Sequence, residues 1–338
     1  MDENVNHEEL IPDNKPEEQR NYSEISEVMD FGFRIKSEIH KVIIGMDDTI
    51  DMLIVGLLTN GHILLEGVPG IAKTLLVKLL ANILNMEYKR IQFTPDLMPS
   101  DVIGTNIYNM KSASFNFRKG PVFSNIILAD EINRAPAKTQ SSLFEVMEER
   151  QVTVDGETYK MKYPLYVIAT QNPIEQEGTY KLPEAQLDRF LFRLKIGYPS
   201  IEEENLILSR FKSDFFNKLE QKVEKLFGPE DILRLTNITE KVYIKDELLN
   251  YISQLIQHTR DNPNIFLGAS PRASIAIMRS SKAYAATHGR DFVTPDDIQK
   301  VANPVLNHRL ILTPEREIEG VNTAEVINDI IKKIEVPR

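Results

Sequence analysis

Five short apolar runs alternate with helical patterns in the first part of the chain, and this alternation limits the possible folds more than any other feature. Such runs predict strands of a parallel sheet, because connecting helices cover both faces and leave neither face of a strand polar. The expected strands are 63–66, 88–93, 126–130, 166–170 and 192–198. The sequence therefore predicts an α/β core in which helices flank a five-stranded parallel sheet on both faces.

Other patterns surround this core. The first residues are polar and acidic and contain two prolines, so we expect a mobile tail there. Ser23 is a suitable N-cap for a helix through about residue 40, and a second helix is expected over 46–59. After the last strand the pattern is helical, with no further strand of consequence. The expected domains are an acidic tail over 1–22, an α/β nucleotide-binding core over 23–199 and an all-α domain over 200–338.

Two hairpins interrupt the alternation of strands and helices. One is expected near 104–120, where Phe115 and Phe117 alternate with polar residues. The other is expected near 151–163, around the Asp155-Gly156 pair that favours a tight turn. Nothing in their residues requires a partner, so plain surface hairpins remain an alternative to a binding role.

A glycine-containing loop follows the first expected strand and opens a helix. Its sequence is GVPGIAKT over 67–74, the spacing of a phosphate-binding loop. Gly67 and Gly70 let the backbone turn and bring its N–H groups to phosphate oxygens, while Lys73 adds positive charge. The general pattern has glycine where this chain has Ala72, and alanine fits without strain only if its φ angle is negative. The loop predicts binding of a nucleoside triphosphate, and ATP is the expected nucleotide.

An acidic pair ends the third expected strand. Asp130 and Glu131 follow a buried apolar run, and polar groups at the carboxyl ends of parallel strands meet at the ligand-binding edge of the sheet. Asp130, together with the Thr74 hydroxyl, is expected to hold Mg²⁺. Glu131 is expected to polarise the water that attacks the γ-phosphate. A strand followed by a polar turn is the plainer interpretation of this pair taken alone.

Composition excludes several other classes of protein. The chain has no cysteine, which rules out disulfides and thiolate catalysis and fits a reducing compartment. The six histidines show no metal-ligand spacing. A net charge of −10 opposes sequence-independent binding of nucleic acid. No secretory signal and no apolar segment near the roughly 18 residues of a spanning helix is visible, so we expect a cytoplasmic protein without membrane insertion.

Four sequence strings together resemble the MoxR branch of the AAA+ ATPases. They are GVPGIAKT at 67–74, DEINRA at 130–135, ATQNP at 169–173 and LPEAQLDRF at 182–190. The resemblance covers roughly residues 24–335, and relatives in this branch commonly carry alanine before the lysine. It implies a nucleotide bound between the α/β core and a helical lid, in a homo-oligomeric ring that is usually a hexamer.

The resemblance also implies an activity and partners. It implies ATP hydrolysis with chaperone-like remodelling or maturation of other proteins, and relatives often act with proteins that carry von Willebrand factor A domains. The inserted hairpins would lie near the ring pore and touch the client. Lys111, Arg118 and Lys119 in the first hairpin leave a nucleic-acid motor as one alternative. A slow nucleotide-dependent scaffold switch is another, since it needs the same site.

Individual site residues are carried over from the resemblance. Asn172 resembles the sensor of the γ-phosphate, and Arg189 the arginine finger that reaches a neighbouring subunit. Arg272 resembles the second sensor, which couples lid position to the nucleotide, and Arg134 is a secondary finger candidate. The plainer interpretation of each arginine is an ion pair or a solvated cation. The expected nucleotide contacts are Ile43, Ile44, Gly67, Val68, Pro69, Gly70, Ile71, Ala72, Lys73, Thr74 and Leu75, the first two packing on adenine.

Overall fold

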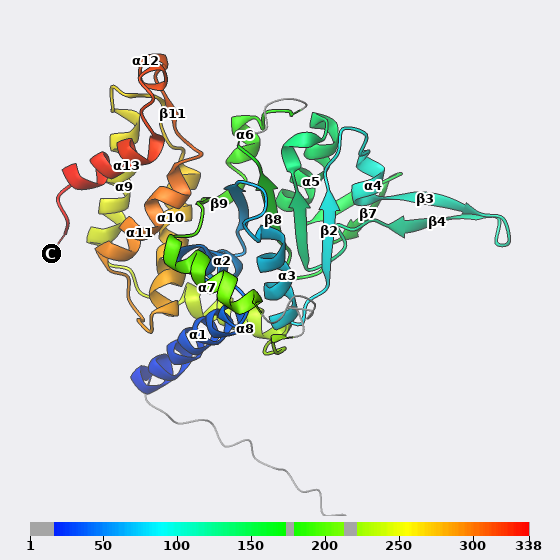
Figure 1. Cartoon of the computed structure of the whole chain (residues 1–338), viewed down its shortest axis with the longest axis horizontal. Helices are drawn as coiled ribbons and strands as arrows, with labels where there is room; N and C mark the ends of the chain where they lie inside the picture. The colour runs from blue at the N-terminus through cyan, green and yellow to red at the C-terminus, as the bar shows by residue number, and fades with distance from the viewer. Residues whose placement is uncertain (1–16, 174–178, 213–221, 338) are drawn as a thin grey trace, which may run out of the picture.

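The fold was examined in a computed structural model that describes residues 17–173, 179–212 and 222–337. An α/β core and a mainly helical lid lie side by side, and a long two-stranded arm projects from the core on the side away from the lid (Figure 1). Among the helices of the described residues, none combines the length and apolar character needed to cross a bilayer.

The core sheet has five parallel strands, as the sequence predicts. In spatial order they are β2 (Tyr88–Gln92), β5 (Ile126–Asp130), β8 (Tyr166–Gln171), β1 (His62–Gly67) and β9 (Phe190–Ile196). Alternate residues of the central strands β5, β8 and β1 enter two separate apolar clusters, one on each face: Ile63 and Leu65 lie in one cluster and Leu64 in the other. Burial on both faces explains why these three strands read as continuous apolar runs, whereas the edge strand β2 has exposed Lys89 and Arg90.

Helices complete the two layers around the sheet. The core helices are α1 (Glu17–His40), α2 (Asp47–Leu58), α3 (Lys73–Ile83), α4 (Pro99–Ile103), α5 (Ala137–Glu149), α6 (Glu184–Leu187) and α7 (Ile201–Phe211), with the short η1 (Ile132–Arg134) after β5. The first of these begins at Glu17, six residues before the expected cap at Ser23. Part of the expected 1–22 tail is therefore helical, and its remainder, 1–16, lies outside the described residues.

Both inserted hairpins form. The first pairs β3 (Gly104–Asn109) with β4 (Ser114–Lys119), and the second pairs β6 (Gln151–Val154) with β7 (Glu157–Lys160). Stacked rings of Phe117 and Tyr159, with centroids 4.3 Å apart, join the two hairpins at their base. The outer part of the β3–β4 hairpin extends beyond this contact and forms the projecting arm of Figure 1.

The lid is not all-α. Its helices are α8 (Pro229–Glu240), α9 (Asp246–Arg260), α10 (Pro271–Thr287), α11 (Pro295–Leu306), α12 (Pro314–Ile318) and α13 (Thr323–Lys333). Between them β10 (Ile265–Leu267) and β11 (Ile311–Leu312) form a small antiparallel sheet, which corrects the all-α expectation. Strands of three and two residues are too short for a period of two to show in the sequence.

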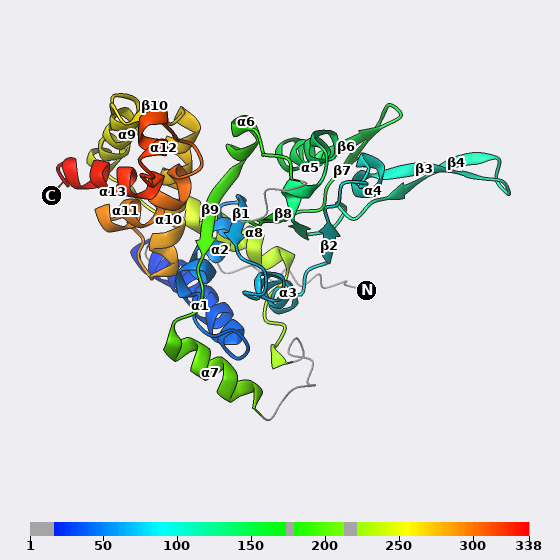
Figure 2. The same cartoon turned by 45° about the horizontal axis from the view of Figure 1, so that its top comes forward.

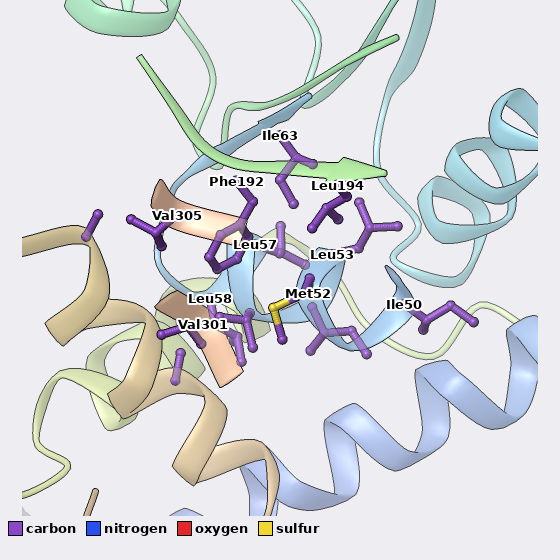
Figure 3. Close-up of a cluster of buried hydrophobic side chains, with 14 of the residues drawn as sticks. Ile50, Met52, Leu53, Leu57, Leu58, Ile63, Phe192, Leu194, Val301 and Val305 are labelled. Carbon is purple, nitrogen blue, oxygen red and sulfur yellow. The ribbon is translucent and has the colours of Figure 1, made fainter. Parts of the chain in front are cut away.

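The lid is attached to the edge of the core sheet. Arg309, His308 and Asn307, which follow α11, donate hydrogen bonds to backbone carbonyl oxygens of β9. Apolar packing continues across the same boundary: Figure 3 shows Val301 and Val305 of α11 beside side chains of α2 and β9. One apolar cluster thus contains residues of both parts of the molecule.

Candidate nucleotide site

The phosphate loop connects β1 to the first residue of α3. Glycine is required at 67, because a Cβ there would lie 2.8 Å from the Ile196 carbonyl oxygen, and at 70, where φ is +86°. Ala72 has φ +60°, so the condition of a negative φ is not met. This alanine occupies the left-handed region, at a cost of about 1–2 kcal/mol. The turn into α3 therefore imposes local strain at the position where the general pattern has glycine.

Lys73 turns back over the loop that precedes it. Its Nζ donates hydrogen bonds to the carbonyl oxygens of Gly67 and, over 3.3 Å, of Val68. Burial lowers the pKa of Lys73, while the charges of Asp130, Glu131 and Glu66 act in the opposite direction. The ammonium group therefore lies among anionic groups inside the loop, where a phosphate could replace the two carbonyl oxygens as acceptor.

The acidic pair lies against the start of α3. Thr74 Oγ1 is 3.5 Å from Asp130 Oδ2. Thr170, at the end of β8, donates to Asp130 Oδ1 and accepts the backbone N–H of Glu131 over 2.9 Å. One hydroxyl and one carboxylate beside a phosphate loop fit the oxygen ligands of Mg²⁺, which takes its remaining ligands from phosphates and water. Thr74 and Asp130 would hold that ion.

Two side chains of β2 hold the acidic pair, and the sequence analysis missed both. Arg90 donates to Asp130 Oδ2 over 3.0 Å from Nε and 2.7 Å from Nη2. Gln92 Nε2 donates to Glu131 Oε2 over 2.8 Å, and Arg134 Nη1 lies 3.4 Å from the same oxygen. Both carboxylates are thus neutralised or hydrogen-bonded. Arg90 and Gln92 alternate along the expected strand, so their side chains point to the same face of it. This pattern predicts a contact with the acidic pair only when β2 is known to lie beside β5.

A cavity of about 580 Å³ opens beside the phosphate loop. Seven of the eleven expected nucleotide contacts line it: Ile43, Ile44, Pro69, Gly70, Ile71, Ala72 and Leu75. The other lining residues come from the 42–49 segment, from the end of β9 with the segment after it, and from α7; β9 and α7 were not predicted to line the site. The arrangement offers an apolar chamber next to the phosphate-binding groups, as a nucleoside attached to phosphates requires.

Another buried ion pair lies at the same end of the sheet. Glu66, the residue before the phosphate loop, accepts from Arg193 of β9 over 2.8 and 3.0 Å. Asn172 is buried just beyond the end of β8, two residues after Thr170. Its role as a sensor stays a prediction that its position at the carboxyl edge of the sheet permits.

Arg189 and Arg272 meet at one carboxylate away from the phosphate loop. Arg189 donates to the carbonyl oxygen of Phe144 over 2.6 Å, and its Nη2 lies 2.8 Å from Glu148 Oε2. Arg272, in the first turn of α10, donates to Glu148 Oε1 over 3.2 Å and lies 3.7 Å from Asp188 Oδ2. Within the described ranges, neither arginine hydrogen-bonds or ion-pairs with the phosphate loop. The arginine-finger candidate Arg189 and the second-sensor candidate Arg272 therefore lie close together, on either side of Glu148.

Comparison with known proteins agrees with this geometry. The ATPase family associated with various cellular activities (AAA) matches residues 62–192, and the AAA lid domain matches 257–330. The chain is 49% identical to the uncharacterized protein YeaC of Bacillus subtilis, over 88% of this chain and 92% of that one. It is 43% identical to chaperone MoxR1 of Mycobacterium tuberculosis, over 89% and 81%.

A solved structure from Cytophaga hutchinsonii, described provisionally as an ATPase, has the same fold. It superposes with a TM-score of 0.83 at 45% identity, over 95% of this chain and 97% of that one. These similarities span both the core and the lid. The chain belongs to the MoxR branch of the AAA+ ATPases.

Proposed function

We propose that this protein hydrolyses ATP with Mg²⁺ and uses the reaction to remodel or mature partner proteins. The observation that carries the proposal is the approach of the Thr74 hydroxyl to within 3.5 Å of Asp130, beside Lys73 and a cavity suited to a nucleoside. Lys73 would bind the β- and γ-phosphates in place of the loop carbonyl oxygens. Bound Mg²⁺ would neutralise charge on the phosphate oxygens.

Glu131 would orient and polarise the attacking water. Its Oε2 accepts from Gln92, which would orient the carboxylate, while its second oxygen can accept a proton from water. Asn172 would hydrogen-bond the γ-phosphate or that water. The segment around Ile43 and Ile44 would pack on the adenine ring, because apolar side chains suit its flat faces.

We further propose that the catalytic unit is a ring, with six subunits as the resemblance implies. Arg189 and Arg272 both bind Glu148; Arg189 would act on the nucleotide of the neighbouring subunit, and Arg272 would couple the position of the lid to the nucleotide. Each is partly exposed, with side-chain accessibilities of 30% and 62%. A guanidinium supplies the planar set of donors that charge on a transferring phosphoryl group demands.

The clients of this ring would be proteins, including those with von Willebrand factor A domains. The outer β3–β4 hairpin exposes Tyr108, Met110 and Phe115 by 52%, 89% and 70%, and solvent-exposed apolar groups of this size favour contact with a polypeptide. The cysteine-free sequence fits the cytoplasm as the location we propose.

Two variants test the site. Lys73→Ala should lose nucleotide binding, and Glu131→Gln should bind ATP but hydrolyse it at least about a hundredfold more slowly. Glu149→Gln, which changes an exposed carboxylate of α5, is the control and should keep wild-type turnover. Retention of wild-type hydrolysis by both site variants would refute the assignment. DNA-stimulated turnover with a steep salt dependence would favour the nucleic-acid motor instead.

A further inference from the structure

The helix α7 forms one wall of the nucleotide cavity. It follows β9 directly, and Figure 2 shows it as a separate helix beside the end of α1, apart from the lid. Arg210 near its end donates to the carbonyl oxygen of His40 over 3.1 Å. Ser200 and Glu203 form a capping box at its start. Through Glu203, Ile207 and Phe211 the helix contributes to the cavity wall.

Glu203 is an acidic group in a mainly apolar chamber. Among the described side chains that line the cavity, Lys195 is the one basic residue and Glu203 the one acidic residue. The Oε2 atom of Glu203 accepts the backbone N–H of Ser200 over 2.8 Å, as the capping box requires. The other carboxylate oxygen, Oε1, lies beside Gly45, the residue after Ile43 and Ile44, which are expected to pack on adenine.

The space that Oε1 occupies exists because residue 45 is glycine. A Cβ on Gly45 would lie 2.0 Å from Oε1, and the backbone there has φ +70°, which favours glycine. The carboxylate is therefore held at a fixed place: one oxygen is bound by the helix start, and the other lies against the Gly45 backbone at the cavity. A carboxylate oxygen can only accept hydrogen bonds.

We propose that Glu203 selects the nucleotide base, by accepting a hydrogen bond from an exocyclic amino group such as the 6-amino group of adenine. Bases with a carbonyl oxygen at that position, hypoxanthine and guanine among them, would face it acceptor to acceptor and bind more weakly. This inference rests on the proposed binding of a nucleoside triphosphate. It adds which base the site prefers and which residue sets the preference.

The Glu203→Gln variant tests the proposed hydrogen bond to the base without disturbing the helix start, because glutamine serves equally well in a capping box. Its carbonyl oxygen can keep the bond from Ser200 N, so the atom facing the cavity changes from an acceptor to an NH₂ donor. ATP carries an amino group at the 6-position of the purine, and inosine triphosphate (ITP) carries a carbonyl oxygen there. The two nucleotides therefore compare a hydrogen-bond donor with an acceptor at the same position. Glu202→Gln, one residue earlier on the exposed side of α7, is the matched control.

The measurement is equilibrium binding of ATP and of ITP to the full chain, by competition with a fluorescent ATP analogue. Wild-type protein and Glu202→Gln should prefer ATP by about tenfold or more, and Glu203→Gln should bring the ratio to about one or invert it. An unchanged ratio in Glu203→Gln, or equal weakening of both nucleotides, would overturn the inference while leaving nucleotide binding intact. If the wild type binds neither nucleotide, the proposed function fails together with it.

Discussion

His62 should make the stability of the core depend on pH. It is the first residue of β1 and is buried. Its Nδ1 accepts the backbone N–H of Val167 over 3.1 Å, and its Nε2 donates to the carbonyl oxygen of Met147 over 3.2 Å. These two bonds require the neutral ring with its proton on Nε2. Burial, aided by the charge of Arg150, lowers the pKa of His62 to about 4.

The sign and size of the effect follow from proton linkage. In the unfolded chain a histidine titrates near 6.5, so below that pH the unfolded state gains a proton that the folded state does not accept until about pH 4. The stabilisation is therefore complete above pH 6.5 and is lost as the pH falls toward 4. The free energy of unfolding falls by about 1.4 kcal/mol for each pH unit below 6.5, so the loss between pH 7.5 and pH 5 is about 2 kcal/mol.

Denaturant unfolding of wild type and His62→Gln at the two pH values measures this loss. The variant should be less stable at pH 7.5, and its deficit should shrink by about 2 kcal/mol at pH 5, because other titrating groups cancel in the difference. The exposed His258→Gln control should show no such change. A His62→Gln deficit that stays constant within about 0.5 kcal/mol between the two pH values would refute the reasoning.

Three further outcomes are expected. Ala72→Gly should raise the free energy of unfolding by about 1 kcal/mol in a denaturant titration, since glycine relieves the positive φ; a loss of stability would show that the left-handed conformation carries no strain. Asp297→Ala should cost about 3 kcal/mol in the same assay, because it removes a buried capping carboxylate and leaves Arg290 without its two bonds of 2.6 Å; a cost below about 1 kcal/mol would contradict this. Arg189→Ala subunits should regain ATP turnover when mixed with Lys73→Ala subunits, and the absence of complementation in mixed rings would remove the shared site.

The sequence predicted most of the fold because its main signals are local. The three central strands β5, β8 and β1 are buried on both faces, and each stands out as an apolar run, while β2 and β9 at the sheet edges alternate apolar with charged or polar residues. The hairpin at Asp155-Gly156 and the proline after Thr294 at the start of α11 are likewise carried by neighbouring residues. The short strands β10 and β11 were missed because two or three residues carry no period.

Contacts that depend on strand order were not predictable from one sequence. Arg90 and Gln92 reach the acidic pair only because β2 lies next to β5. Arg272 and Glu148 are 124 residues apart and meet where the lid contacts the core. The sequence also left the sign of φ at Ala72 open, and only the structure shows that the turn into α3 makes it positive.

The hydrogen bonds from the lid to β9 predict how a fragment without the lid would behave. An outer strand normally presents bare carbonyl groups that can pair with another chain. Here Arg309, itself buried, covers several of them, together with two neighbouring side chains. A fragment ending at residue 199 would uncover that strand and half of a shared apolar cluster, so it should aggregate rather than fold alone. Because they share one apolar cluster, the core and the lid should unfold together in a single transition.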